Sequence, residues 1–296
     1  MSSNTSTKFV YHEPGLQHQF EDMAQQEASV SAAMWVFLVQ EIMFFGGLFA
    51  AYLVMRSKYP LAFAAGSNHL DVVMGFTNTL VLIVSSLTMA LTVYFAQVNN
   101  RTMQVVMIIL TMLFGTVFLG VKVVEYTDKW THGIVPVEGL NRIVRAPASA
   151  PDAAVHDPSG HEYINPRGEF QWREYELVEE MIAKQQAQPS GHFLTASEKV
   201  GYFSNGELDQ DKFRDKVRIF FWIYFVMTGL HAVHMIIGLG IMLWLLWTAF
   251  KGNYNAEYYS PVEASGLYWH FVDLMWIFIF PALYLLNPYS GTLPVH

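Results

Sequence analysis

Five long stretches of the sequence contain almost no Asp, Glu, Lys or Arg, and this feature limits what the chain can fold into. Among these four residue types, only Glu41 and Asp273 occur inside them. The stretches are 28–55, 72–100, 102–121, 219–250 and 264–296. A transmembrane helix needs about 20 mostly apolar residues, so each stretch is long enough to cross a bilayer. Because helices satisfy their own backbone hydrogen bonds in lipid, we predict an all-α, polytopic membrane helix bundle with five transmembrane helices.

The composition argues against a soluble protein with the same helices. Charged residues make up only 14% of the chain, against roughly 25% in soluble domains. Of the 17 basic and 25 acidic residues, 25 lie between positions 127 and 217, so little charge remains to cover five helices. A net charge of −8 without a basic cluster argues against nucleic acid as a partner. Zero cysteines exclude disulfides and thiolate-bound metals.

The chain divides by composition into four regions. We expect a polar N-terminal segment without a signal-peptide pattern, three transmembrane helices, a long polar extramembrane insertion, and two further transmembrane helices with the C-terminus. These regions are 1–27, 28–126, 127–217 and 218–296. Within the insertion, residues 170–188 have the apolar spacing of an amphipathic helix. Thr195 and Glu198 have the spacing of a capping box, which predicts another short helix before the fourth span.

Glu41 lies near the middle of the first span. Ionisable groups at membrane depth are costly and usually face the bundle interior, so Glu41 is a candidate functional carboxylate. The alternative is a neutral Glu that only fixes helix packing. Small residues follow it at four-residue spacing, and this pattern predicts a close helix contact. They are Gly46 with Ala50 and Gly47 with Ala51.

The later spans carry further polar candidates. His231 and His234 share one face of the fourth span, and His270 and Asp273 share a face of the fifth. No thiolate and no HExxH motif accompanies these histidines, so interhelical hydrogen bonds are favoured over a metal site. Four residues on one side of the second span are expected to bond to neighbouring helices: Asn78, Ser85, Thr88 and Thr92. Glu125 ends the third span, where a carboxylate is usually solvated.

Short motifs in all five spans resemble subunit III of the haem–copper cytochrome c oxidases, and they occur in the order of that family. They are Gln40-Glu41-Ile42-Met43-Phe44-Phe45-Gly46, Asn78-Thr79-Leu80-Val81-Leu82, Glu125-Tyr126, Thr228-Gly229-Leu230-His231-Ala232-Val233-His234-Met235-Ile236-Ile237-Gly238 and Tyr268-Trp269-His270-Phe271-Val272-Asp273-Leu274-Met275-Trp276. One such motif is weak evidence, whereas the ordered series is specific.

The resemblance implies an accessory subunit with no active site of its own. Its partners are expected to be the catalytic subunit I, which holds the haems and copper, other oxidase subunits, and structural phospholipids. It implies support of proton uptake during aerobic electron transport. The carbodiimide-reactive carboxylate of the family corresponds to Glu41. Interhelical polar or lipid-cleft positions correspond to His231, His234, Trp269, His270, Asp273, Glu125 and Asn78. None of these residues binds a redox metal in the family, so no cofactor is expected on this chain.

The chain departs from the family pattern in three places. Longer members have seven spans, and the first two are absent here. The insertion is much longer than usual, which suggests a docking surface for a cytochrome or another respiratory complex. A His-x-Gly-x-Glu pattern before the last span is replaced by Tyr259-Ser260-Pro261-Val262-Glu263. The family places the N-terminus inside, in the cytoplasm, and the long loop outside, although loop charges favour the opposite orientation. Five spans without a transit peptide favour a bacterial plasma membrane over an organelle.

Two other functions remain open from the sequence. A subunit of a quinol oxidase, or of a complex associated with a nitric-oxide reductase, would share the fold. An autonomous proton or ion carrier built around Glu41 belongs to a different class. Transporters commonly show repeated halves and broken helices, and the sequence has neither pattern.

Overall fold

The structure is a computed structural model that describes residues 16–131, 194–252, 254 and 258–285, with three short strands between 131 and 194. Five long helices dominate it, in agreement with the all-α prediction. They are α1 (Met23–Lys58), α3 (Val72–Gln97), α4 (Arg101–Thr131), α7 (Gln210–Lys251) and α8 (Ser260–Phe280), the last continued by the π-helix η1 (Pro281–Leu285). Each contains a segment long and apolar enough to cross a membrane, so the five predicted spans are confirmed.

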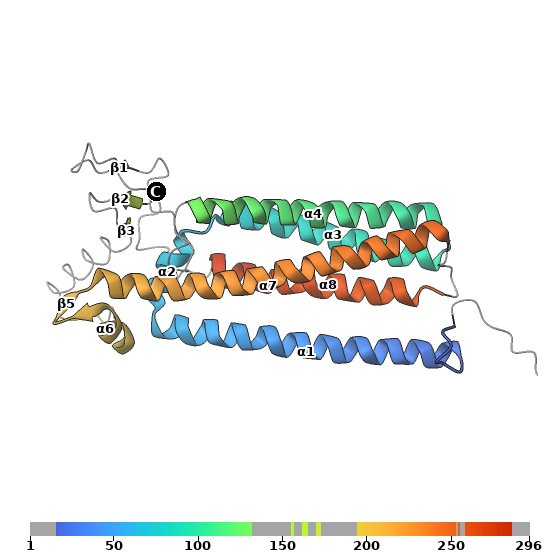
Figure 1. The fold of residues 1–296 in the computed structure, drawn as a ribbon, viewed down its shortest axis with the longest axis horizontal. Helices are drawn as coiled ribbons and strands as arrows, with labels where there is room; N and C mark the ends of the chain where they lie inside the picture. The colour runs from blue at the N-terminus through green and yellow to red at the C-terminus, as the bar shows by residue number, and fades with distance from the viewer. Residues whose placement is uncertain are drawn as a thin grey trace, which may run out of the picture.

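Shorter elements cluster at one end of the bundle, which we call the loop end (Figure 1). They are α2 (Pro60–Asn68), α6 (Ala196–Tyr202) and the strands β1 (Val155–His156), β2 (Glu162–Ile164), β3 (Phe170–Trp172), β4 (Phe203–Ser204) and β5 (Glu207–Leu208). Strands β1, β2 and β3 form an antiparallel sheet in that order, and β4 pairs with β5. The helix predicted over 170–188 is therefore wrong at its start, and 173–188 lie outside the described residues.

Local sequence signals explain where the helices begin. Asp22 caps α1 by accepting from the Gln25 backbone N–H, and Asp71 caps α3 in the same way. The predicted capping box is confirmed, because the Thr195 hydroxyl and the Glu198 carboxylate each accept from the other residue's backbone N–H. Glu198 is fully buried and also accepts from Leu61 N–H of α2, 2.9 Å away, which fastens α6 to the α1–α2 connection.

The helices differ in how deeply they are buried. In the most apolar 18-residue segment of α8, 61% of the residues are buried inside the protein, whereas in the corresponding segment of α1 only 17% are buried. Helix α1 runs along one edge of the bundle (Figure 1). The close fit around α8 depends on Trp269, since a Cβ added at Gly115 of α4 or at Gly238 of α7 would lie 2.7 Å or 3.0 Å from its ring.

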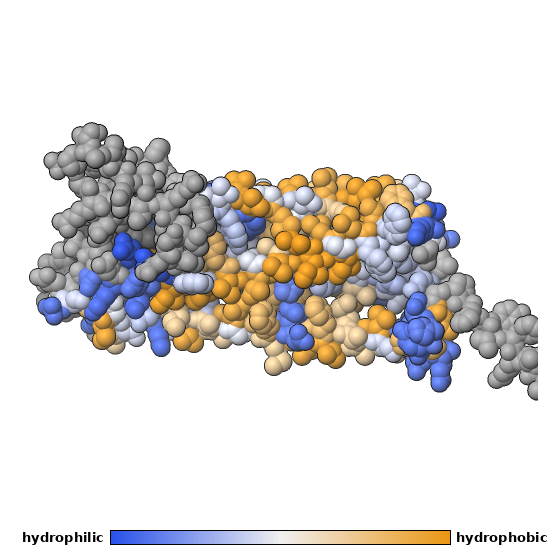
Figure 2. Space-filling model, in the orientation of Figure 1, coloured by the Kyte–Doolittle hydropathy of each residue, from blue (hydrophilic) through white to orange (hydrophobic). Residues whose placement is uncertain are grey.

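The outer surface of the bundle is apolar along most of its length. Figure 2 shows an orange band between hydrophilic ends, with a small hydrophilic patch inside the band near the seam of α1 and α7. Many large apolar side chains are exposed there, including Met43, Val73 and Trp247. In water such an area would favour aggregation, so the surface is one that lipid or other membrane helices cover. The chain is a multi-pass membrane protein.

One expected contact is not made. Gly46 and Gly47 have nothing within 4 Å of an added Cβ, and their face of α1 is exposed. The prediction that the small residues of the first span mark a close helix contact is therefore wrong within the described part of this chain. Packing between α1 and the bundle instead uses the face that carries Glu41, Phe45 and Tyr52.

Candidate functional site

The structure brings Glu41 of α1 next to His234 of α7. Their nearest atoms, Glu41 Oε2 and His234 Nε2, are 3.2 Å apart. This is the distance of an ion pair, although the angles do not meet those of a hydrogen bond. Glu41 is 9% exposed, and Phe45 packs against the imidazole with ring centroids 5.6 Å apart. The predicted intramembrane carboxylate thus has an imidazole partner from another helix.

The second ring nitrogen of His234 fixes how protons are distributed. His234 Nδ1 lies 2.8 Å from the carbonyl oxygen of Leu230, which can only accept, so Nδ1 carries a hydrogen. Two arrangements follow. In the first, Nε2 also carries a proton and faces an ionised Glu41. In the second, Nε2 carries no proton and faces the protonated carboxyl of Glu41. Both arrangements have zero net charge and differ by the position of one proton. The pair can therefore hold a proton at membrane depth without placing an uncompensated charge there.

His231 lies one turn before His234, in a different environment. It is buried, and its ring packs between Phe118 and Trp276 with centroid distances of 5.4 Å and 5.2 Å. Neither ring nitrogen has a hydrogen-bond partner among the described residues. Our expectation of interhelical hydrogen bonds is therefore wrong for His231, since aromatic packing positions it instead. The His234 ring bonds to a carbonyl of its own helix and contacts Glu41 of α1 as an ion pair.

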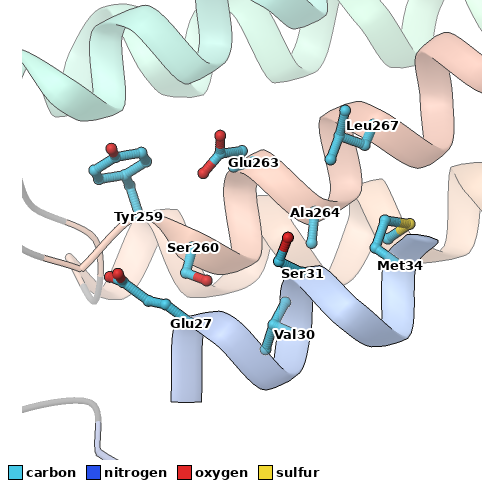
Figure 3. Close-up of a pocket in the computed structure, with 9 residues that line it drawn as sticks. All are labelled: Glu27, Val30, Ser31, Met34, Tyr259, Ser260, Glu263, Ala264 and Leu267. Carbon is cyan, nitrogen blue, oxygen red and sulfur yellow. The ribbon is translucent and has the colours of Figure 1, made fainter. Parts of the chain in front are cut away.

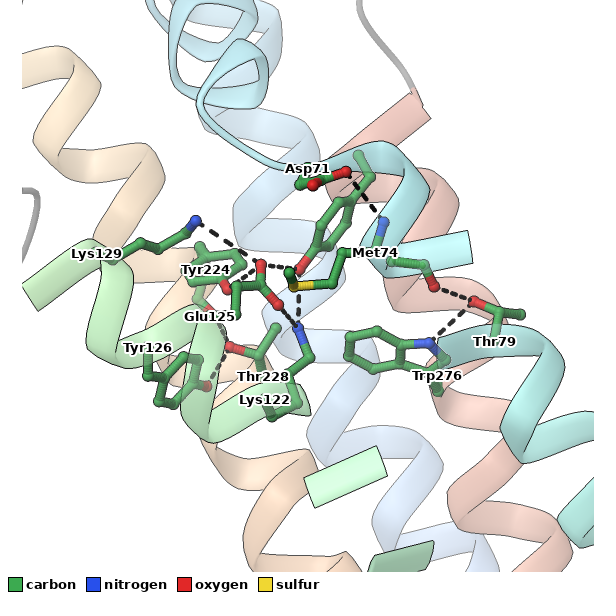
Figure 4. Close-up of polar contacts among 12 residues, drawn as sticks. Asp71, Met74, Thr79, Lys122, Glu125, Tyr126, Lys129, Tyr224, Thr228 and Trp276 are labelled. Carbon is green, nitrogen blue, oxygen red and sulfur yellow. Dashed lines mark hydrogen bonds and ion pairs between the residues drawn. The ribbon is translucent and has the colours of Figure 1, made fainter. Parts of the chain in front are cut away.

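Glu125 is the centre of a polar cluster at the loop end (Figure 4). Its carboxylate accepts from Lys122 Nζ at 2.5 Å, from Tyr284 at 2.6 Å and from Tyr224 at 2.8 Å. Lys129 Nζ is 3.8 Å away. These five side chains, which we call the Glu125 cluster, join α4 to α7 and η1.

The Glu125 cluster corrects the sequence interpretation. Glu125 is only 4% exposed, and Lys122 and Lys129 are 3% exposed, so the expected solvated carboxylate is instead buried between two lysines. Lys122 also donates to Tyr284 at 2.8 Å and lies 4.4 Å from the Trp276 ring centroid. Neither lysine is among the functional candidates predicted from the sequence. Their positions three before and four after Glu125, on one helix face, are the signal that could have found them.

Two of the four polar residues that were predicted to bond from the second span to neighbouring helices make such hydrogen bonds. Ser85 accepts from the indole N–H of Trp269 at 3.0 Å, and Thr88 bonds to Thr111 of α4 at 2.8 Å. Among the described residues, Thr92 bonds only to the Thr88 carbonyl of its own helix. Asn78 is buried, and neither of its side-chain polar atoms has a partner in the described regions. The same helix thus carries both satisfied and unsatisfied polar groups.

His270 and Asp273 line a cleft between α1, α3 and α8 with a volume of about 640 Å³. They do not bond to each other: His270 Nδ1 lies 2.7 Å from Ser86 Oγ, and neither carboxyl oxygen of Asp273 has a partner within the described chain. The remaining lining is almost entirely apolar and includes Leu38, Ile42 and Leu87. We call this space the midplane cleft.

A smaller hollow of about 210 Å³ lies where α1 and α8 begin (Figure 3). Glu27, Ser31 and Glu263 line it together with Tyr259, at the place where the sequence departs from the family pattern. Across residues 16–131, 194–252 and 258–285, no group of three His, Asp or Glu side chains could hold a metal ion.

Comparisons with known proteins point to one family. The family described as cytochrome c oxidase subunit III matches residues 191–287. Cytochrome c oxidase subunit 3 of Thermostichus vulcanus is 38% identical over 73 residues, which are 24% of this chain and 36% of that protein. A probable quinol oxidase subunit 3 of Staphylococcus haemolyticus is 23% identical over 87% of this chain and 89% of its own length.

A third relative, haem–copper oxidase subunit I+III of Aeropyrum pernix, is 24% identical over 86% of this chain, which covers 22% of that longer protein. The family match covers the last two spans, and the alignments with the second and third relatives cover most of the chain. Both agree with the motifs that run through all five spans. These comparisons support a likeness to subunit III of the haem–copper oxidases.

Proposed function

We propose that this chain is the non-catalytic subunit III of a respiratory haem–copper cytochrome c oxidase. In this role it stabilises the catalytic subunit and supports proton uptake during aerobic electron transport. The observation that carries the proposal is the Glu41–His234 pair: a buried carboxyl and an imidazole from different helices, 3.2 Å apart inside the bundle. The pair supplies no redox centre, so electrons are handled by the haems and copper of partner subunits.

The exposed face of α1 is the surface that we assign to the partner. Gly46, Gly47, Ala50 and Ala51 form a smooth strip on this face, and small residues allow two membrane helices to approach closely. The fused name of the Aeropyrum pernix relative, subunit I+III, supports a subunit I-type chain as the neighbour. Gly46→Leu is expected to weaken association with subunit I in a pulldown, whereas Leu243→Ala on exposed α7 leaves it unchanged.

Phospholipids are proposed to cover the remaining apolar surface, with the chain in a bacterial plasma membrane. The N-terminus is then cytoplasmic and the 127–217 insertion faces outside. The insertion is proposed to dock a cytochrome or another respiratory complex. Deleting residues 142–188 is expected to weaken that association, and an unchanged set of co-purified proteins would remove the insertion from the proposal.

The main test concerns Glu41. In the purified complex, Glu41→Gln is expected to abolish carbodiimide labelling of this chain and leave the haem absorption spectrum intact, because the amide keeps the shape but cannot react. Glu263→Gln, an exposed carboxylate in the first turn of α8, is the matched control and keeps the labelling. Loss of the haem spectrum with Glu41→Gln would assign this residue to assembly instead.

The accessory role predicts a particular kinetic defect. A complex purified without this chain is expected to start turnover near the normal rate and then lose activity, because proton delivery slows. An absent initial rate in an otherwise assembled complex contradicts the role. A carrier that works alone would instead purify without haem-bearing partners and move ions in vesicles.

A second candidate is subunit III of a quinol oxidase, which the long alignment with the Staphylococcus haemolyticus protein favours. The two candidates differ in the electron donor of the whole complex. Oxidation of reduced cytochrome c by the purified complex supports the first, and oxidation of a quinol without cytochrome c supports the second.

A further inference from the structure

Gln40 is a polar side chain that faces outward in the middle of an apolar helix. Its side chain is exposed on α1, and its carboxamide has no hydrogen-bond partner among the described residues. The nearly uncharged stretch around it runs from Ala28 to Met55, so Gln40 is 12 residues from the start and 15 from the end. These lengths are about 18 Å and 22 Å at 1.5 Å per residue. Because the hydrocarbon core is about 30 Å thick, Gln40 lies near the bilayer midplane.

Gln40 belongs to a face of α1 that is exposed along its length. Val36, Met43 and Val54 share this face and are 69%, 74% and 51% exposed. Gly47 is exposed between them, and a Cβ added there would meet nothing within 4 Å. At about 100° per residue these five positions fall within an arc of about 60°. We call this surface the Gln40 face.

The Gln40 face is separate from the sides of α1 that have neighbours within the fold. Glu41 lies 3.2 Å from His234 of α7, and Leu38 and Ile42 line the midplane cleft beside α3 and α8. Gln40 is about 100° around the helix from Glu41. A partner on the Gln40 face therefore packs against α1 without entering the contact between Glu41 and His234.

The depth and polarity of this face decide what covers it. The hydrocarbon core contains no water, so a carboxamide that faces acyl chains keeps its donors and its acceptor unpaired, which costs free energy. A phospholipid headgroup stays at the membrane surface, and an acyl chain offers no hydrogen bond. A transmembrane helix of another chain offers one, because it satisfies its own backbone groups and carries polar side chains to this depth.

We propose that Gln40 forms a hydrogen bond at the bilayer midplane with a polar side chain of a subunit I-type transmembrane helix, which packs along the Gln40 face. A carboxamide both donates and accepts, so the partner side chain is Ser, Thr, Asn, Gln or His. Gly47 lies two turns further along, where the missing side chain lets the two backbones approach closely. The inference rests on the proposed function, since it takes subunit I as the neighbour of α1, and it adds the residue that fixes the depth of the contact.

The test is site-specific photo-crosslinking in the purified complex with all its subunits. A diazirine amino acid in place of Met43 is expected to form an adduct with a transmembrane helix of the subunit I-type chain, identified by mass spectrometry. The same amino acid in place of Leu243, on an exposed face of α7, is the control and forms adducts with lipid. Gln40→Leu is expected to lower the adduct yield at position 43 about three- to tenfold, because it removes the interhelical hydrogen bond and keeps an apolar side chain of similar size. Gln40→Asn keeps the carboxamide and retains most of the yield.

The outcomes separate this inference from the proposed function. An adduct with lipid alone at position 43, in a complex that keeps its haem absorption spectrum, overturns the inference and leaves the accessory role in place. A yield that Gln40→Leu does not lower also overturns it, as does an adduct with a second copy of this chain. A chain that purifies without any haem-bearing partner contradicts the proposed function itself.

Discussion

The Glu125 cluster at the loop end and the polar groups at the bilayer midplane satisfy their hydrogen-bonding needs in opposite ways. Glu125, Lys122, Tyr224 and Tyr284 bond to one another in a closed network. At the midplane, His231 and Asp273 have no hydrogen-bond partner within the described residues, and Glu41 lies 3.2 Å from His234. The first region uses charge to hold helices together, whereas the second contains buried polar atoms that lack a partner among the described residues.

Charge explains the difference. Lys122 pairs with Glu125 and lies against the rings of Trp276, Tyr284 and Tyr224. Lys129 lies near the carboxylates of Glu125, Asp128 and Asp71. Such a buried ion group is stable only while every member is paired. The midplane groups are neutral or can become neutral by moving one proton. They therefore tolerate missing partners at lower cost.

The largest expected effect comes from opening the Glu125 cluster. Glu125→Gln removes the carboxylate that pairs with buried Lys122, and breaking a buried ion pair costs about 3–5 kcal/mol. The free energy of unfolding, measured by denaturing-detergent titration of the full chain, should fall by this amount. Glu263→Gln serves as the exposed control and changes it little. An equal response from both variants would show that Glu125 is solvated after all.

Close packing, and not hydrogen bonding, is expected to stabilise the midplane. Gly115→Ala places a Cβ 2.7 Å from the Trp269 ring, and overpacking of this kind costs about 1–3 kcal/mol. Gly120→Ala in the same helix meets nothing within 4 Å, and is expected to stabilise by about 0.5–1 kcal/mol because alanine favours helices. The same titration compares them. Similar values for both would mean that Trp269 moves aside freely.

A smaller loss is expected from one hydroxyl of the cluster. Tyr284→Phe removes a donor to Glu125 and an acceptor for Lys122 without changing the ring, so the free energy of unfolding should fall by about 1–2 kcal/mol. Tyr94→Phe, at an exposed tyrosine of α3, is the control. An unchanged free energy of unfolding with Tyr284→Phe would indicate that the lysines and Glu125 stabilise the cluster without the Tyr284 hydroxyl.

The smallest effect is expected at His231. His231→Phe keeps an aromatic ring between Phe118 and Trp276 and removes two unpaired nitrogens, so the free energy of unfolding should stay within about 1 kcal/mol or rise. A loss above about 2 kcal/mol would reveal a hydrogen-bond partner of His231 and remove the contrast between the two regions. Thermal unfolding of the full chain in mild detergent measures the same change.

Residue patterns predicted the membrane architecture well and the side-chain partners less well. The five spans and the Thr195–Glu198 capping box are local features, since they depend on residues close in sequence. The partner of Glu41 lies 193 positions later in the chain, at His234. Glu125 looked solvated because it ends an apolar stretch, but α7 and η1 cover that end. Burial of this kind depends on helices that sequence spacing does not place.

The sequence by itself determined that five helices cross a membrane, because apolar length and the need for internal backbone hydrogen bonds leave few alternatives. It also determined which polar residues lie at membrane depth. Only the tertiary structure decided which of them are paired, because a side chain's partner depends on how helices distant in sequence rotate and pack. That packing placed Glu41 beside His234, enclosed two lysines around Glu125, and buried Asp273 at the wall of an apolar cleft.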